Sequence, residues 1–182
     1  MILPDIPRQY TALAEWLACL LYILALRRRF GRTATAVSAG FWLAGLSLFL
    51  QLTGNVPIAW WIPCMAAAVA AMYAFLYLCC SVNAREAGYC CARAFILAEF
   101  AASLEWQIHC LLWPQSGARE LRSLILLLLV YGLVYGFVYR FEFRRVRKNP
   151  ELGITRRALC SAVVMALAAF AVSNFAFTRA GT

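Results

Sequence analysis

The sequence predicts an all-α fold: one domain, residues 1–182, that forms a polytopic bundle of transmembrane helices. The chain is 64% hydrophobic, only 14% of its residues are charged, and its mean hydropathy is +0.74. A soluble domain is usually ~45–50% apolar and ~25% charged, so a soluble fold of this composition would lack the polar surface needed to cover its core. The chain is therefore expected to be an integral membrane protein.

Six apolar stretches approach the ~20 residues that a bilayer crossing needs. Short polar turns separate them and leave no room for a soluble domain in between. The predicted spans are residues 11–26, 34–52, 57–80, 92–113, 121–139 and 158–177.

The first span does not have the pattern of a cleavable signal peptide. No basic segment precedes it, Glu15 lies inside it, and a cluster of arginines follows it, which reverses the order of a secretory signal. An apolar run followed by basic residues is typical of a stop-transfer anchor. The first span is therefore expected to stay in the membrane.

Small residues in the fifth span predict a close helix contact. Gly132 and Gly136 form a G-x-x-x-G pattern, and such spacing lets two helix backbones approach each other. Two interpretations are open: dimerisation with a second copy, and a contact within one bundle, which is favoured. A stripe of tyrosines lies beside the glycines: Tyr131, Tyr135 and Tyr139.

The basic residues predict the orientation. Loops rich in Lys and Arg near helix ends stay in the cytoplasm, so loops one, three and five are expected inside and the amino terminus outside. The net charge of +9 is then an orientation signal and a contact with lipid headgroups, not a nucleic-acid surface. The first and fifth loops carry most of this charge: Arg27, Arg28, Arg29, Arg32, Arg140, Arg144, Arg145, Arg147, Lys148, Arg156 and Arg157.

An external start and six spans place the end of the chain outside as well. The last residues, TRAGT, contain neither a basic anchor nor an aromatic belt. A seventh span is therefore expected beyond residue 182.

The eight cysteines predict neither a disulfide framework nor a metal site, and no cofactor is expected. Cys79–Cys80 and Cys90–Cys91 are expected to bracket the third loop, on the reducing cytoplasmic side. Adjacent cysteines lack the C-x-x-C spacing that surrounds a tetrahedral ion.

The fourth span contains most of the candidate functional residues. Ionisable groups at membrane depth are costly, roughly 2.5 kcal/mol each or more, so they normally face a protein interior or a water-filled cavity. Glu105 and His109 lie one turn apart on one face and could hydrogen-bond, whereas Arg93 and Glu99 point elsewhere. Polar groups on several sides predict a central helix. The candidates for a ligand site or switch are Glu15, Arg93, Glu99, Glu105, Trp106, Gln107 and His109.

A structural interpretation of the same residues stays open. Arg93 would then extend to the cytoplasmic surface, Glu99 would be protonated or paired with a hydroxyl, and His109 would lie at the outer interface.

Two segments, AFILAEFAASLEWQIHCLL and RRALCSAVVMALAAFAVSNFAF, carry a resemblance to a known family. With the basic loop between them, they resemble the N-terminal membrane (sensor) domain of bacterial GHKL-type sensor histidine kinases, relatives of the receptor kinases of peptide quorum sensing. The specific similarity lies around residues 94–107 and 156–177. The resemblance implies a multi-pass protein of the bacterial plasma membrane, a homodimer, and a small-molecule or peptide signal in a two-component system.

The kinase itself is absent from this chain. Its single aspartate, Asp5, and its isolated asparagines cannot supply an ATP site, so the chain is not expected to be an enzyme. The expected function is therefore a membrane-embedded sensor or input module. Two alternatives remain: the substrate-binding membrane subunit of a vitamin-type transporter, and a structural membrane protein without a ligand.

Overall fold

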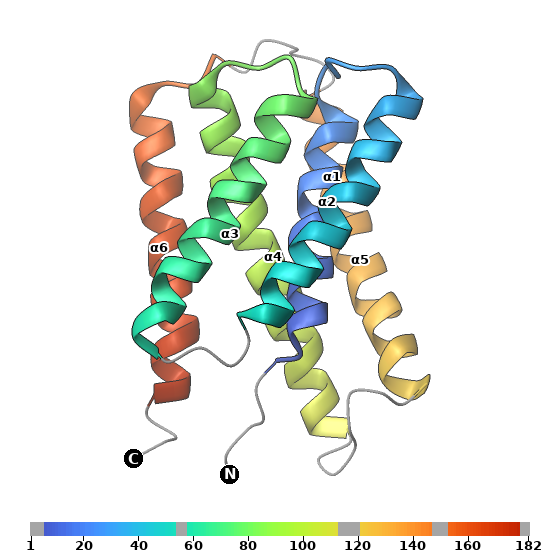
Figure 1. Ribbon diagram of the computed structural model, residues 1–182, viewed down its shortest axis with the longest axis vertical. Helices are drawn as coiled ribbons and strands as arrows, with labels where there is room; N and C mark the ends of the chain where they lie inside the picture. Colours follow the sequence, from blue (N-terminus) through green and yellow to red (C-terminus); the bar gives the residue numbers. More distant parts are fainter. Residues whose placement is uncertain (1–5, 54–57, 113–120, 147–152, 179–182) are drawn as a thin grey trace.

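The computed structural model describes residues 6–53, 58–112, 121–146 and 153–178, without the side chains of residues 58, 59, 61, 142–146 and 172–178. These residues form six α-helices that run up and down along one direction (Figure 1). The helices are α1 (Arg8–Ala25), α2 (Arg32–Leu52), α3 (Ile58–Cys79), α4 (Ala84–Leu112), α5 (Leu121–Val146) and α6 (Arg156–Thr178). The all-α prediction is confirmed.

Four helices are long and apolar enough to cross a membrane, within the part of the chain that the structure describes. They are the stretches Arg32–Leu52, Ile62–Cys79, Ala84–Leu112 and Leu121–Phe141. The helix α1 is less apolar because its 18 residues include Arg8, Gln9 and Glu15. The structure thus supports a membrane protein with at least four candidate crossings, and six crossings stay a prediction.

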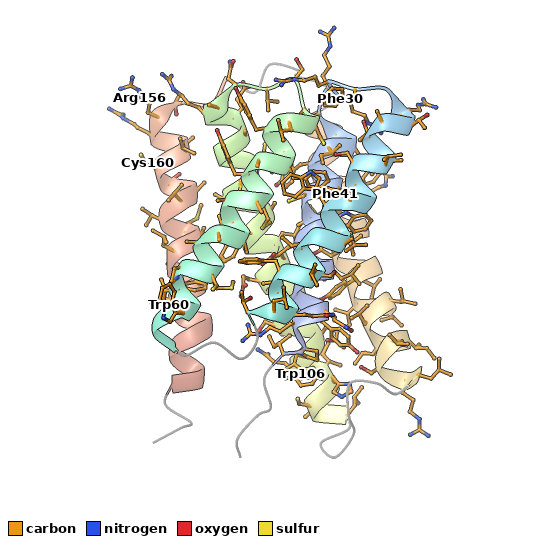
Figure 2. All side chains as sticks on the ribbon, in the orientation of Figure 1. Phe30, Phe41, Trp60, Trp106, Arg156 and Cys160 are labelled. Carbon is orange, nitrogen blue, oxygen red and sulfur yellow. The ribbon has the colours of Figure 1, made fainter. Side chains whose placement is uncertain are left out.

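The outer surface of the bundle is apolar. Large hydrophobic side chains on the outer faces are more than half exposed, among them Phe41 at 77% (Figure 2). Contiguous apolar surface of this kind is rare on soluble monomers and is typical of a surface that meets lipid or protein. The other large examples include Val37, Leu48, Leu128, Leu133 and Phe137.

The helix α4 lies at the centre of the bundle. It contacts α1, α3, α5 and α6, whereas α2 packs against α1 and α3, and α6 packs against α4 alone among the described helices. Both α1 and α4 carry several buried alanines, and small residues allow helix backbones to approach closely. Among these alanines are Ala14 and Ala18 on α1 and Ala94, Ala98, Ala101 and Ala102 on α4.

The start of α4 corrects the predicted third loop. The fourth span was expected to begin at residue 92, but the helix begins at Ala84, so the loop shrinks to a few residues after Cys80. The Glu86 carboxylate accepts a hydrogen bond from the backbone N–H of Asn83 at 3.0 Å. This is the contact that the third helical residue makes in a capping box. This cap starts the helix eight residues early. Cys90 and Cys91 therefore lie buried inside α4 and do not border a loop.

Backbone hydrogen bonds join the α1–α2 loop to the α3–α4 loop at one end of the bundle, called here the arginine end because Arg27, Arg28 and Arg29 lie in the first of these loops. The Arg29 amide donates to the Cys79 carbonyl at 2.9 Å, and the Ser81 amide donates to the Arg27 carbonyl at 2.8 Å. The Arg29 guanidinium also lies 5.7 Å from the centre of the Tyr77 ring. These contacts hold the α1–α2 connection against the α3–α4 connection.

The basic loops share one end of the bundle, as the orientation argument requires. Figure 2 places Phe30 of the first loop and Arg156 at the same end, while Trp60 and Trp106 lie towards the opposite end. In Figure 1, α1 begins and α6 ends at that opposite end. The residues around the fifth loop, 147–152, lie outside the described part of the chain.

Candidate functional site

Polar side chains gather where α1, α4 and α5 meet. Three hydrogen bonds, made by four hydroxyl groups, bridge α1 and α5. The Tyr131 hydroxyl donates to the Tyr10 carbonyl at 2.9 Å, and the Tyr135 hydroxyl donates to the Ala14 carbonyl at 2.7 Å. The Tyr10 hydroxyl and the Ser123 hydroxyl lie 2.6 Å apart, and both residues are buried. Because both ends of these contacts are buried, α5 is tied to α1 along more than two turns.

Glu105 of α4 lies in the interior of the bundle near Tyr131, one member of this hydroxyl ladder of Tyr10, Ser123, Tyr131 and Tyr135. Its side chain is 0% exposed, and neither carboxyl oxygen has a hydrogen-bond partner. The carboxyl is close enough to Tyr131 to interact with it electrostatically. Burying a polar group without a hydrogen bond costs about 1–3 kcal/mol by mutational measurement. Burial of this carboxyl therefore lowers the stability of the packing between α1, α4 and α5.

His109 is buried one turn further along α4, as its spacing from Glu105 predicts, but the expected hydrogen bond between them does not form. The imidazole ring instead stacks on Trp106, with ring centres 5.1 Å apart and planes only 7° from parallel. The Tyr10 ring meets the Trp106 ring edge-on at 6.5 Å. His109 is thus packed into the bundle, three residues before α4 ends.

Glu15 is the second fully buried carboxyl. It is 0% exposed, on α1, and both of its oxygens lack a hydrogen-bond partner. Glu99 of α4, which is partly buried, is near enough for the two carboxyls to interact electrostatically. Glu15 is therefore a candidate whose carboxyl the structure places in the interior of the bundle without a hydrogen-bond partner.

Arg93 and Gln107 point away from these carboxyls. The Arg93 guanidinium donates to the Tyr89 hydroxyl at 3.2 Å, one turn nearer the arginine end of the bundle, and lies 5.6 Å from the centre of that ring. This direction agrees with the structural interpretation of Arg93. Gln107 is exposed and donates to the Ser103 hydroxyl at 3.1 Å.

The glycine pair of α5 does not make a contact within the bundle, which was the favoured interpretation of its G-x-x-x-G pattern. A Cβ atom added at Gly132 or Gly136 would meet nothing within 4 Å. Both glycines are exposed, so they do not bring α5 close to another helix of this bundle. The contact with α1 is made by the neighbouring tyrosines.

The described residues contain no group of three or more His, Cys, Asp or Glu side chains placed to hold a metal ion. The α1–α4–α5 interface therefore offers carboxyl, hydroxyl and aromatic groups, which can exchange protons, bind small polar species or change partners. Sequence reasoning overlooked the roles of Tyr10, Ser123, Tyr131 and Tyr135. The four-residue spacing of the tyrosines in an otherwise apolar helix was the signal, because buried hydroxyls need partners.

Comparison with protein-family models, with curated proteins and with solved structures finds no match to this chain.

Proposed function

We propose that this chain is a membrane-embedded sensor module, the input part of a signal-transducing receptor of the histidine-kinase type. The proposal includes six crossings of a bacterial plasma membrane, with the amino terminus outside and the arginine-rich loops inside. A kinase would then be contributed by sequence outside this chain. The similarity of residues 94–107 and 156–177 to GHKL-type sensors supports this assignment.

The buried Glu105 carboxyl is the single observation that carries the proposal. A group that is fully buried and lacks a hydrogen-bond partner makes the observed packing less stable than it would be with an apolar side chain. A second arrangement of α4, in which the carboxyl gains a partner or water, is then close in free energy. Two packings of similar free energy are what a switch requires.

A signal acts on such a switch only if it binds its two states differently. A proton on Glu105, or a small polar molecule that reaches the Glu105–His109 face, would meet that condition because the carboxyl environment differs between the packings. The central position of α4 then transmits the change. Any shift of α4 alters its contacts with α1, α3, α5 and α6.

Sensor kinases of this type act as homodimers, and α5 offers a surface for that contact. Gly132 and Gly136 face outward with open space beside them. Two copies could bring their α5 backbones together along this pattern, as small-x-x-x-small helices do in membranes.

The test joins residues 1–182 to a borrowed cytoplasmic histidine kinase domain and measures reporter output in bacteria. Glu105→Gln and His109→Ala are expected to shift basal output or its dependence on external pH and ligand. Gln107→Ala is the matched control, because Gln107 is exposed on the same helix between the two test residues. Membrane insertion is measured for all variants by fractionation.

One result would overturn the proposal. If Glu105→Gln and His109→Ala both insert normally and give the wild-type response across the pH and ligand range, the cluster is structural.

A further inference from the structure

The arginine end of the bundle carries a positive charge that the described residues do not neutralise. Within the described part of the chain, none of its arginines forms an ion pair with a carboxylate. The carboxylate of Glu86, which lies at the same end, is engaged by the Asn83 backbone N–H. The arginines are Arg27, Arg28, Arg29, Arg32, Arg85, Arg156 and Arg157, and all except Arg28 are fully exposed. This end of the bundle is therefore suited to an anionic partner.

Arg29 is the arginine whose position the structure fixes most closely. Its backbone N–H donates to the Cys79 carbonyl at 2.9 Å, and its guanidinium lies 5.7 Å from the centre of the Tyr77 ring. The Tyr77 ring stacks in turn on the Tyr73 ring, with centres 5.9 Å apart and planes 5° from parallel. A guanidinium over an aromatic face is attracted by the ring electrons. The charge of Arg29 is therefore held against the side of α3.

Exposed apolar side chains adjoin this fixed charge. Tyr77 is 38% exposed and Leu78, the next residue of α3, is 48% exposed. Phe30, the residue after Arg29, is exposed at the same end of the bundle (Figure 2). An anion that carries apolar chains can use the charge and the apolar side chains together, whereas a free phosphate can use only the charge. A phospholipid has both parts.

We propose that Arg29, held on the Tyr77 ring, binds the phosphate of one anionic phospholipid, whose acyl chains lie against the exposed apolar side of α3. A stacked guanidinium keeps its in-plane N–H groups, and two of them can bind one phosphate in parallel. The basic loops alone predict general contact with lipid headgroups. The stacking of Arg29 on Tyr77 narrows that contact to one place.

This site requires a membrane protein, but neither a kinase nor a particular orientation, so it is independent of the sensor proposal. The full chain is purified in a neutral detergent and transferred to about 0.15 M ammonium acetate, in which charges more than ~8 Å apart are largely screened. Native mass spectrometry then measures the binding of phosphatidylglycerol. Phosphatidylcholine with the same acyl chains is the zwitterionic comparison and should bind more weakly.

Three variants test the two residues of the site. Arg29→Gln keeps the backbone N–H and should weaken phosphatidylglycerol binding by about tenfold or more, as expected for the loss of hydrogen bonds to a charged group. Tyr77→Leu leaves the net charge unchanged and should also weaken binding, because the guanidinium loses the ring that holds it. Tyr77→Phe keeps the ring and should bind as the wild type does.

The matched control is Arg157→Gln, which removes the same charge from an exposed position at the start of α6. Its affinity should stay close to that of the wild type. Thermal unfolding without lipid shows that each variant is folded. If Arg29→Gln does not fold, Tyr77→Leu and Tyr77→Phe decide.

Four results would overturn the proposal. Equal weakening in Arg29→Gln and Arg157→Gln would show a general attraction to the positive end. Wild-type affinity in Tyr77→Leu would remove the ring from the site, and equal binding of the two lipids would remove the preference for an anion. Displacement of the lipid by an equal concentration of inorganic phosphate would assign the arginine to free phosphate. The sensor proposal fails separately, through Glu105→Gln and His109→Ala.

Discussion

The attachment of α5 to α1 can be tested by removing one hydroxyl group. Tyr135→Phe deletes the donor of the 2.7 Å hydrogen bond to the Ala14 carbonyl and keeps the ring, which is only 8% exposed. Ala14 lies inside α1, where its carbonyl already accepts the regular helical hydrogen bond, so the change leaves no unsatisfied acceptor. The loss should therefore be the net value of one interhelical hydrogen bond, ~0.6 kcal/mol on average and at most ~1.7 kcal/mol in membrane proteins.

That loss is measurable as a change in thermal stability. For a chain of this length, 1 kcal/mol corresponds to about 2–4 °C in melting temperature. Tyr131→Phe, which removes the 2.9 Å bond to the Tyr10 carbonyl, should cause a similar decrease. The double variant should melt below both single variants, without strict additivity, because the two tyrosine rings are in contact with centres 5.8 Å apart. Thermal unfolding in one detergent, followed by tryptophan fluorescence, compares the four proteins.

The control is Tyr73→Phe. The Tyr73 hydroxyl donates to the Ala84 carbonyl at 3.4 Å in an exposed position, beyond the usual range of a strong hydrogen bond. This variant should melt with the wild type. The reasoning is refuted if Tyr135→Phe and Tyr131→Phe also melt with the wild type, because the hydroxyl ladder would then contribute nothing to the α1–α5 interface.

Three further outcomes are expected. Gly136→Ile should reduce the dimer fraction in cross-linking without lowering the melting temperature. The control Gly45→Ile, at an equally open site on α2, should change neither the dimer fraction nor the melting temperature. Equal dimer fractions in the wild type and both variants would exclude the α5 contact. Glu86→Ala removes the capping contact with the Asn83 backbone N–H and should destabilise the protein by about 0.3–1 kcal/mol, while Glu86→Gln, which keeps an acceptor oxygen, should lose less. In a chain without its native cysteines, a membrane-impermeant thiol reagent added outside the cell should label Gln9→Cys but not Gly31→Cys. The reverse labelling pattern would show that the orientation is opposite to the proposed one.

The helices were predictable because each consists of a long apolar run. The helix α4 starts before the predicted fourth span, and this difference has a physical reason. The segment NAREAGYCCAR is polar enough to suggest a loop, and hydropathy alone places the fourth span after it. The helix starts earlier because the Glu86 carboxylate accepts a hydrogen bond from the backbone N–H of Asn83, which has no acceptor within the helix. Asparagine followed three residues later by glutamate was a local signal that an apolar window does not register.

The direction in which α5 faces was not predictable from its apolar composition. Gly132 directly follows Tyr131, and Gly136 directly follows Tyr135, so each pair differs by about 100° around the helix. Either stripe could have faced the bundle. The tyrosines do so because their hydroxyls find carbonyl acceptors on α1, and an unpaired hydroxyl in an apolar interior would be costly. Hydroxyl pairing between helices depends on which helices are neighbours, and hydropathy contains no information on neighbours.

The same lack of information about neighbouring helices explains why the surroundings of the buried carboxyls were not predictable. The sequence indicated that α4 is central because its polar groups point to several sides, and its contacts with four helices confirm this. The sequence did not show that the Glu15 carboxyl would be fully buried without a hydrogen-bond partner. Nor did it show that Glu105 would lack the His109 hydrogen bond that their spacing favours.

Those two carboxyls, Glu15 and Glu105, depart most clearly from what a stable apolar bundle requires. An apolar side chain at either position would fill the interior of the bundle without the loss of hydration that a buried carboxyl suffers. Local features that oppose stability are expected mainly at functional or strained sites, because elsewhere the sequence and fold agree. Structural explanations are already available for the other polar candidates: Arg93 contacts Tyr89, and Gln107 contacts Ser103 at the surface. Glu15 and Glu105 therefore remain the strongest functional candidates, because their carboxyl oxygens have no hydrogen-bond partner in the observed packing.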